Sequence, residues 1–160
     1  AAAAHVVLTN DSIVGPFVDM APFLAEAADS GADVYAATAN RQIAPHLQSY
    51  LLGFTRGVLA DRPLARFFRS IGPAPSKMDY VRRYEVGLST LLRNEGYGTY
   101  VKWLSPGWER EADNRSLKDW RQLLDEGFPF IKKMLLTGED ADNIAREIDA
   151  RFGILVKEWL

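Results

Sequence analysis

Short apolar runs alternate with longer stretches of helical periodicity along the 160 residues of this chain. The runs have the length and the aliphatic and aromatic content of buried strands. They predict strands over residues 5–9, 33–38, 47–54 and 99–103. The longer stretches are bounded by proline, glycine and capping residues, as helices usually are. They predict helices over residues 16–29, 62–71, 78–94, 116–126, 129–136 and 142–152, with Ser116 and Asp119 as a capping box.

This alternation predicts an α/β domain in which helices flank a small mixed sheet. A chain of 160 residues, 48% of them hydrophobic, can bury one sizeable core. No repeat and no clear linker divides the chain, so we expect residues 5–160 to form a single domain. Residues 1–4, all alanine, have low complexity, and we assign them no role.

Composition excludes several classes of function. The formal net charge of −2 argues against a nucleic-acid-binding protein, which normally carries a basic face. The chain has no cysteine, so disulfides, thiolate zinc sites and a cysteine nucleophile are excluded, which fits a reducing cytoplasm. No apolar run is long enough to span a bilayer, so we expect no transmembrane segment and at most peripheral membrane contact.

Polar residues open the strand predicted over residues 47–54. His46, Gln48, Ser49 and Tyr50 lie where the pattern otherwise indicates burial. A buried polar group without a hydrogen bond costs about 1–3 kcal/mol, so this group is either satisfied internally or directed at a polar ligand. Strand alternation places His46 and Gln48 on one face and Ser49 on the other, so we predict that His46 and Gln48 share the site. The alternative for His46 is a bond to a backbone carbonyl at the strand entrance.

Four segments in this order resemble the rhamnan synthesis protein F family. They are residues 7–12 with Gly15 and Pro16 close behind, 46–54, 84–89 and 127–133. The resemblance spans roughly residues 6–136 and implies a glycosyltransferase of bacterial surface polysaccharide assembly, similar to the GT-A superfamily. The half that grips the nucleotide is not visible in the chain. We therefore expect the chain to be the carboxy-terminal part of the catalytic domain, the second half of a GT-A fold; the alternatives are a truncated product and a binding or assembly module.

The resemblance implies a donor site around Asn10, Asp11 and Ser12. In GT-A enzymes an acidic motif after a strand holds a divalent cation on the donor diphosphate, so Asp11 is the expected ligand of manganese or magnesium. The usual second acid is absent here, which leaves metal dependence open. The alternative for the motif is an Asx turn of purely local importance. His46, Gln48 and Lys132 complete the expected donor-binding residues.

The same resemblance implies that Glu85 is the general base that deprotonates the acceptor hydroxyl. Asp79 is the alternative base, and a solvated charged helix face is the alternative to any catalytic role. Tyr84 and Trp108 are the expected acceptor contacts, since aromatic faces stack on sugar rings.

These expectations describe an enzyme that transfers rhamnose or another deoxyhexose from a nucleotide-sugar donor. The acceptor would be a bacterial cell-surface polysaccharide, as a glycan or a lipid-linked glycan, at the inner face of the cytoplasmic membrane. The alternative is a non-catalytic carbohydrate-binding or assembly domain derived from the same fold.

Overall fold

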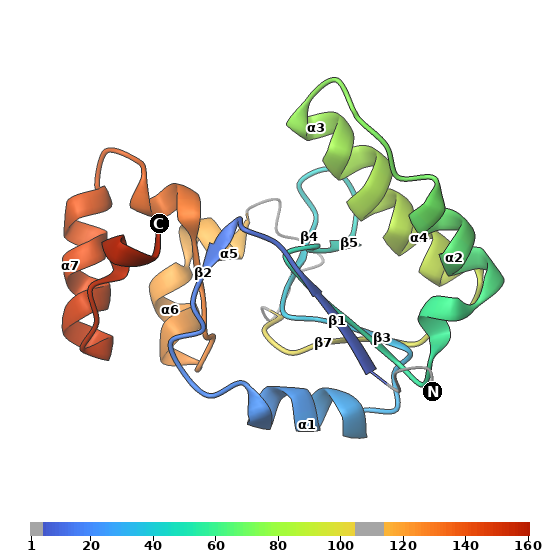
Figure 1. Ribbon diagram of the computed structural model, residues 1–160, viewed down its shortest axis with the longest axis horizontal. Coiled ribbons are helices and arrows are strands. Elements are labelled where there is room, and N and C mark those ends of the chain that lie inside the picture. The colour runs from blue at the N-terminus through green and yellow to red at the C-terminus, as the bar shows by residue number, and fades with distance from the viewer. Residues whose placement is uncertain (1–4, 105–113) are drawn as a thin grey trace.

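A four-stranded sheet forms the centre of the computed structural model, which describes residues 5–104 and 114–160. Its strand order is β1-β6-β3-β7 (Figure 1). Strand β6 runs antiparallel to β1 and to β3, whereas β3 and β7 run parallel. The predicted class, α/β with a small mixed sheet and flanking helices, is confirmed. The strands are β1 (His5–Thr9), β3 (Val34–Ala36), β6 (Leu51–Thr55) and β7 (Thr99–Val101).

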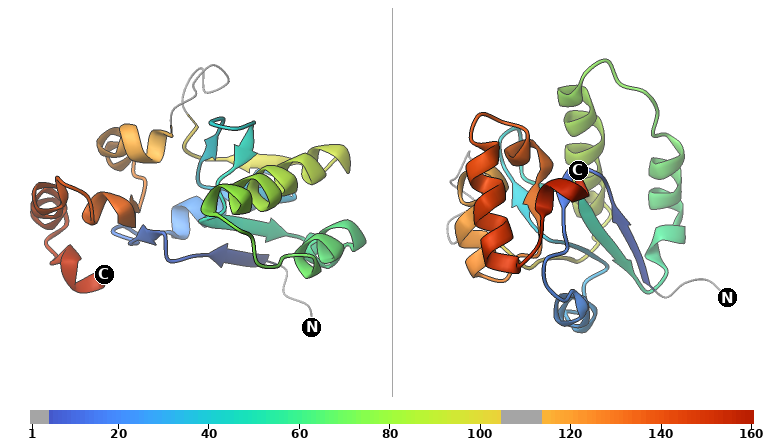
Figure 2. Two further views of the ribbon diagram at one scale, coloured as in Figure 1. Left: turned by 90° about the horizontal axis from the view of Figure 1, so that it is seen from above. Right: turned by 60° about the vertical axis from the view of Figure 1, so that its left-hand side comes forward.

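Helices cover both faces of this sheet (Figures 1 and 2). Successive strand residues point to opposite faces, so Tyr35 packs with Phe23 of α1 on one face, while Val34 packs with Leu88 and Leu92 of α4 on the other. The second face also carries α2, which a short 3₁₀ turn, η1 (Val58–Ala60), connects to the sheet. The covering helices are α1 (Ala21–Asp29), α2 (Arg62–Arg69), the π-helix η2 (Val81–Val86) and α4 (Gly87–Asn94); α3 (Lys77–Tyr80) leads into η2.

Besides the hydrophobic cores on the two faces of the sheet, a third hydrophobic core lies beside the sheet. It contains residues from near both ends of the chain. Strand β2 (Ile13–Val14) pairs with β8 (Ile131–Lys132), and Val14 and Ile131 pack with Ile148 of the carboxy-terminal helix. Figure 1 shows these carboxy-terminal helices on the side away from α2 and α4. The elements here are α5 (Arg115–Lys118), α6 (Trp120–Asp125), η4 (Lys133–Leu136), α7 (Ala141–Phe152) and η5 (Val156–Trp159).

Several predicted elements differ from the structure. The helix predicted from residue 16 begins at Ala21, because residues 13–17 are bound to the segment around β8, where the Phe17 N–H donates to the Pro129 carbonyl over 2.8 Å. The helix predicted over residues 129–136 is replaced by β8 and η4. The capping box predicted at Ser116 is also wrong, since Asn114 caps α5.

The strand predicted over residues 47–54 is divided in two. Strand β5 (His46–Leu47) forms a hairpin with β4 (Ala39–Asn40), and the chain then turns before β6 begins at Leu51. Strand alternation therefore does not continue across residues 48–50, and this break determines the geometry of the candidate site.

Candidate functional site

The candidate site lies at one end of the central sheet. Strands β1, β3 and β7 all point toward this end, and β6 starts there, since Thr9 faces Leu51 and Ala36 faces Leu52. In open α/β sheets, ligands bind outside the carboxyl ends of the strands. Most of the predicted site residues lie on segments that enter or leave the sheet here.

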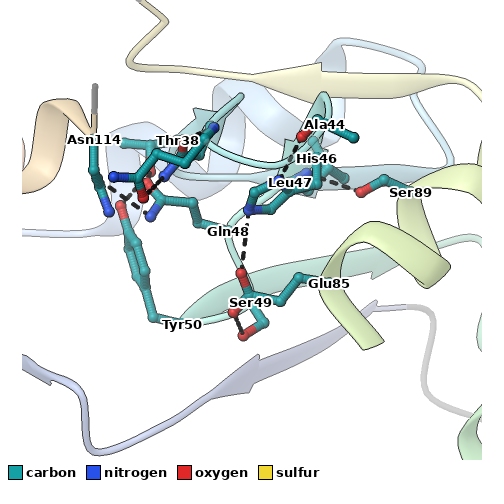
Figure 3. Close-up of polar contacts among 12 residues, drawn as sticks. Thr38, Ala44, His46, Leu47, Gln48, Ser49, Tyr50, Glu85, Ser89 and Asn114 are labelled. Carbon is teal, nitrogen blue, oxygen red and sulfur yellow. Dashed lines mark hydrogen bonds and ion pairs between the residues drawn. The ribbon is translucent and has the colours of Figure 1, made fainter. Parts of the chain in front are cut away.

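His46 of β5 and Ser49 from the turn between β5 and β6 both contact Glu85 of the π-helix (Figure 3). The Ser49 hydroxyl donates to Glu85 Oε1 over 2.6 Å, and His46 Nε2 lies 3.3 Å from Glu85 Oε2. The Leu47 N–H donates to Ser89 Oγ over 2.9 Å, which fixes β5 against α4. The predicted pairing of His46 with Gln48 is therefore wrong: because the strand is interrupted, Ser49 accompanies His46.

Hydrogen bonding indicates that His46 is protonated and Glu85 is ionised. The His46 side chain is 2% exposed, and its Nδ1 lies 2.7 Å from the Ala44 carbonyl, so both ring nitrogens face acceptors. Burial by itself would lower the pKa of His46, but the bonds to Glu85 and Ala44 outweigh it and raise that pKa. Burial would raise the pKa of Glu85, but its bonds to His46 and Ser49 and the charge of Lys132 lower it.

Lys132 adds a second cation to this site. It lies on β8, and its Nζ is 3.8 Å from the centroid of the Tyr50 ring. Burial lowers the pKa of Lys132 to about 8; the charge of Glu85 opposes this shift and that of Lys77 adds to it. The site therefore brings an imidazolium, a carboxylate and a partly desolvated ammonium group together.

A separate polar chain occupies the neighbouring end of β3. The Thr38 hydroxyl donates to Gln48 Oε1 over 2.5 Å, so the Tyr50 hydroxyl, also 2.5 Å from Thr38, acts as donor. Gln48 Nε2 in turn donates to Asn114 Oδ1 over 3.4 Å. Thr38, Gln48 and Tyr50 are all buried. The sequence left two possibilities for these polar groups, internal hydrogen bonding or a polar ligand. The structure shows internal hydrogen bonding for Gln48.

The segment Asn10–Ser12 forms the turn from β1 to β2. Asn10 Oδ1 accepts hydrogen bonds from the Ser12 N–H over 3.0 Å and from the Ser12 hydroxyl over 2.6 Å. The segment therefore forms the local Asx-type turn, in which the side-chain amide oxygen of Asn10 is the acceptor. Asp11 is exposed at the same sheet end. Within residues 5–104 and 114–160, no group of three or more His, Cys, Asp or Glu residues is arranged to hold a metal ion.

The other predicted residues lie apart from the Glu85 cluster. The Tyr84 hydroxyl donates to the Gly72 carbonyl over 2.9 Å and accepts from the Gly72 N–H over 3.0 Å, so it holds the loop after α2. Asp79, the alternative base, accepts a bond from the hydroxyl of Ser76, the N-cap residue of α3. Trp108 lies outside the described residues.

Sequence reasoning missed two members of the site. Thr38 lies two residues after the end of β3, and a polar residue near the carboxyl end of a buried strand is a signal that could have identified it. Asn114 bonds Gln48 and also caps α5 through the Ser116 N–H. Its spacing to Ser116 indicates a helix cap, but nothing local in the sequence points to Gln48.

A cleft of about 340 Å³ adjoins His46. It lies between the β4–β5 hairpin, α4 and β7, and is mainly apolar. Ser89, Arg93 and Thr99 supply polar groups to its wall. Because His46 also lines this cleft, the cleft adjoins the ion pair with Glu85.

The comparison with protein families identifies the chain. The model of the rhamnan synthesis protein F family matches residues 3–151, so this protein belongs to that family. Family membership connects it with rhamnan synthesis, a pathway of cell-surface polysaccharide formation. Searches among curated proteins and among solved structures found no match. In the part of the chain that the structure describes, no helix is long and apolar enough to cross a membrane.

Proposed function

We propose that this protein is a glycosyltransferase, or the carboxy-terminal part of one with a GT-A-like fold. It would move rhamnose or another deoxyhexose from a nucleotide-sugar donor to a growing cell-surface glycan, at the inner face of the cytoplasmic membrane. The observation that carries this proposal is the convergence of Glu85, His46 and Lys132 at the carboxyl end of the sheet. Buried charges add little to stability, and groups with shifted pKa values gather at functional sites.

Glu85 is the proposed general base. As the bond from the anomeric carbon to the diphosphate breaks, positive charge develops on that carbon and the acceptor oxygen bonds to it. The acceptor hydroxyl then loses its proton to the Glu85 carboxylate. The low pKa of Glu85 keeps this carboxylate ionised at neutral pH. A weak base is sufficient because the hydroxyl becomes more acidic as its oxygen bonds to the cationic carbon.

His46 and Ser49 are proposed to position this base. Both nitrogens of His46 are engaged within the protein, so its effect on substrate passes through Glu85. Ser49 fixes the other carboxylate oxygen. Together they hold the carboxylate plane while each oxygen keeps a lone pair for the incoming proton.

Lys132 and the turn after β1 are proposed to bind the donor. A partly desolvated ammonium group stabilises the charge that develops on the leaving diphosphate more strongly than one in water. Gln48 supports the same wall of the site through Thr38 and Asn114. A manganese or magnesium ion fits only as a companion of the diphosphate, because Asp11 is the one carboxylate of the Asn10–Ser12 turn. It would neutralise diphosphate charge there.

The test compares Glu85→Gln with Glu95→Gln, an exposed acid at the carboxyl-terminal cap of α4 that undergoes the same charge change. Donor binding is measured by thermal shift with a panel of nucleotide diphosphate sugars, with and without manganese or magnesium. Transfer to a glycan acceptor is measured separately. We expect Glu85→Gln to lower the transfer rate by about 10²–10⁴-fold and to retain the donor-induced shift.

Other outcomes identify the alternative. If Glu85→Gln and the wild type transfer sugar equally, Glu85 is not the base. If no donor shifts the unfolding temperature but a glycan does, the protein is a carbohydrate-binding or assembly domain without a donor site.

A further inference from the structure

The helical hairpin above the sheet concentrates positive charge in an otherwise acidic chain. Six of the nineteen basic residues lie between residues 61 and 83, together with two acidic ones, so this segment carries +4 while the whole chain carries −2. All six basic side chains are exposed. They are Arg62, Arg66, Arg69, Lys77, Arg82 and Arg83, and we refer to them, with the loop between them, as the α2–η2 surface.

These cations are not neutralised by the protein itself. Across residues 5–104 and 114–160, none of these six side chains forms an ion pair or a hydrogen bond. The two acids of the segment are used elsewhere: Asp61 accepts a bond from the Tyr97 hydroxyl, and Asp79 belongs to the Ser76 cap. The surface therefore presents net positive charge to solvent.

Apolar side chains are exposed among the cations. Ile71 is 44%, Met78 49% and Tyr80 44% exposed, next to the exposed prolines of the loop at residues 70–76. The two bonds between Tyr84 and Gly72 hold this loop against η2. Figures 1 and 2 show the loop and α3 projecting beyond the sheet, at the free end of the hairpin.

We propose that the α2–η2 surface docks on an anionic phospholipid membrane. Apolar and aromatic side chains at a projecting end enter the headgroup region, and surrounding arginines and lysines attract the acidic lipid headgroups. The exposed apolar side chains favour a membrane over a nucleic acid as the partner. A protein binds single-stranded nucleic acid through positive charge and aromatic stacking in a groove.

The same surface adjoins the candidate site. Lys77 is near enough to Lys132 to contribute to the lowering of its pKa, and Glu85 follows Arg83 by two residues. Docking would therefore bring the site to the membrane, where a lipid-linked acceptor would be presented; this link to the acceptor depends on the proposed function, whereas docking does not.

The test is co-sedimentation with two vesicle preparations, phosphatidylcholine alone and phosphatidylcholine mixed with phosphatidylglycerol. We expect binding to the mixed vesicles, weakening with added salt, and little binding to the neutral ones. The double variant Arg82→Gln, Arg83→Gln should lower the affinity by about 30-fold, at the usual contribution of a basic residue near an anionic surface. The matched control, Arg146→Gln with Arg151→Gln on α7, removes the same charge at the other end of the molecule and should change affinity by less than about twofold.

A second pair of variants tests the apolar contribution. Ile71→Ser with Met78→Ser keeps the charge and should still lower vesicle affinity, because apolar burial contributes to interfacial binding. The proposal fails if no vesicle binds, if the α7 and η2 variants lose equal affinity, or if the surface binds a short RNA and ignores vesicles. Glu85→Gln should bind vesicles like the wild type, so a failure of docking and a failure of the proposed catalysis are distinguishable.

Discussion

At the scale of single residues, the ion pair of His46 and Glu85 is held by groups that the sequence places far apart. The sequence indicates which residue types matter, since a histidine, an amide and a hydroxyl open an apolar run. It does not indicate which of them meet. The turn at residues 48–50 brings Ser49 rather than Gln48 to Glu85, and that turn carries neither glycine nor proline as a signal.

The first prediction concerns the pH dependence of stability. The fold raises the pKa of His46 above 6.5, so its contribution is complete below that value and is lost as pH rises through the raised pKa. The fold lowers the pKa of Glu85 below 4.5, so its contribution is present above that value and is lost as pH falls through the lowered pKa. Urea unfolding should show that Glu85→Gln loses most stability, about 1–3 kcal/mol, near pH 5.5.

The loss should shrink as pH rises, because His46 then becomes neutral in the wild type as well. Glu95→Gln is the control, since that carboxylate is exposed. A loss that stays constant between about pH 5.5 and 9 would contradict a charged pair.

A second prediction at this scale concerns Tyr35 and Gly53, which face each other across β3 and β6. A Cβ added to Gly53 would lie 1.8 Å from the Tyr35 ring, so Gly53→Ala should cost about 3 kcal/mol or more.

Among the described residues the buried Tyr35 hydroxyl has no hydrogen-bond partner. Tyr35→Phe should therefore be neutral or stabilising by about 1 kcal/mol in chemical denaturation, and a clear loss would show that the hydroxyl has a partner, such as water.

At the scale of elements, the long helix over residues 77–94 was predicted almost to its ends, because its apolar spacing and the residues that bound it are local signals. The π-helical segment Val81–Val86 within it was not predicted. Its sequence contains neither proline nor glycine, so nothing local indicates the change of hydrogen bonding. Such segments are frequent at functional sites, and Glu85 lies in this one.

The third prediction separates capping from catalysis at the start of this helix. The Asp79 N–H donates to Ser76 Oγ over 3.2 Å. Ser76→Ala should therefore cost about 1 kcal/mol of unfolding free energy, and Asp79→Asn no more than that. Neither change should alter sugar transfer beyond its effect on folding. Loss of transfer in Asp79→Asn with unchanged stability would instead identify Asp79 as the base.

At the scale of the whole molecule, local sequence patterns predicted a sheet flanked by helices. They did not predict the pairing of β2 with β8, which connects the two ends of the chain. Strands β2 and β8 have two residues each, too few for alternation to be visible. Their pairing depends on a partner more than a hundred residues away. It also places Lys132 at the site, because Lys132 faces Ile13 in that register. The site thus depends on contacts between the amino-terminal segment that carries β2 and the carboxy-terminal segment that carries β8.

The last prediction follows from this placement of Lys132. Burial lowers its pKa from 10.5 to about 8, so the cost of holding the charged form is fully present below pH 8 and fades as pH rises toward 10.5. Lys132→Met should therefore be neutral or more stable by about 1 kcal/mol at pH 7, with the gain reduced by the lost contact to the Tyr50 ring. This gain should vanish above about pH 10 in denaturant unfolding. If Lys132 binds the donor diphosphate, the same variant should lose the donor-induced thermal shift while gaining stability. A variant that is less stable at every pH and binds donor normally would mean that Lys132 only packs on Tyr50.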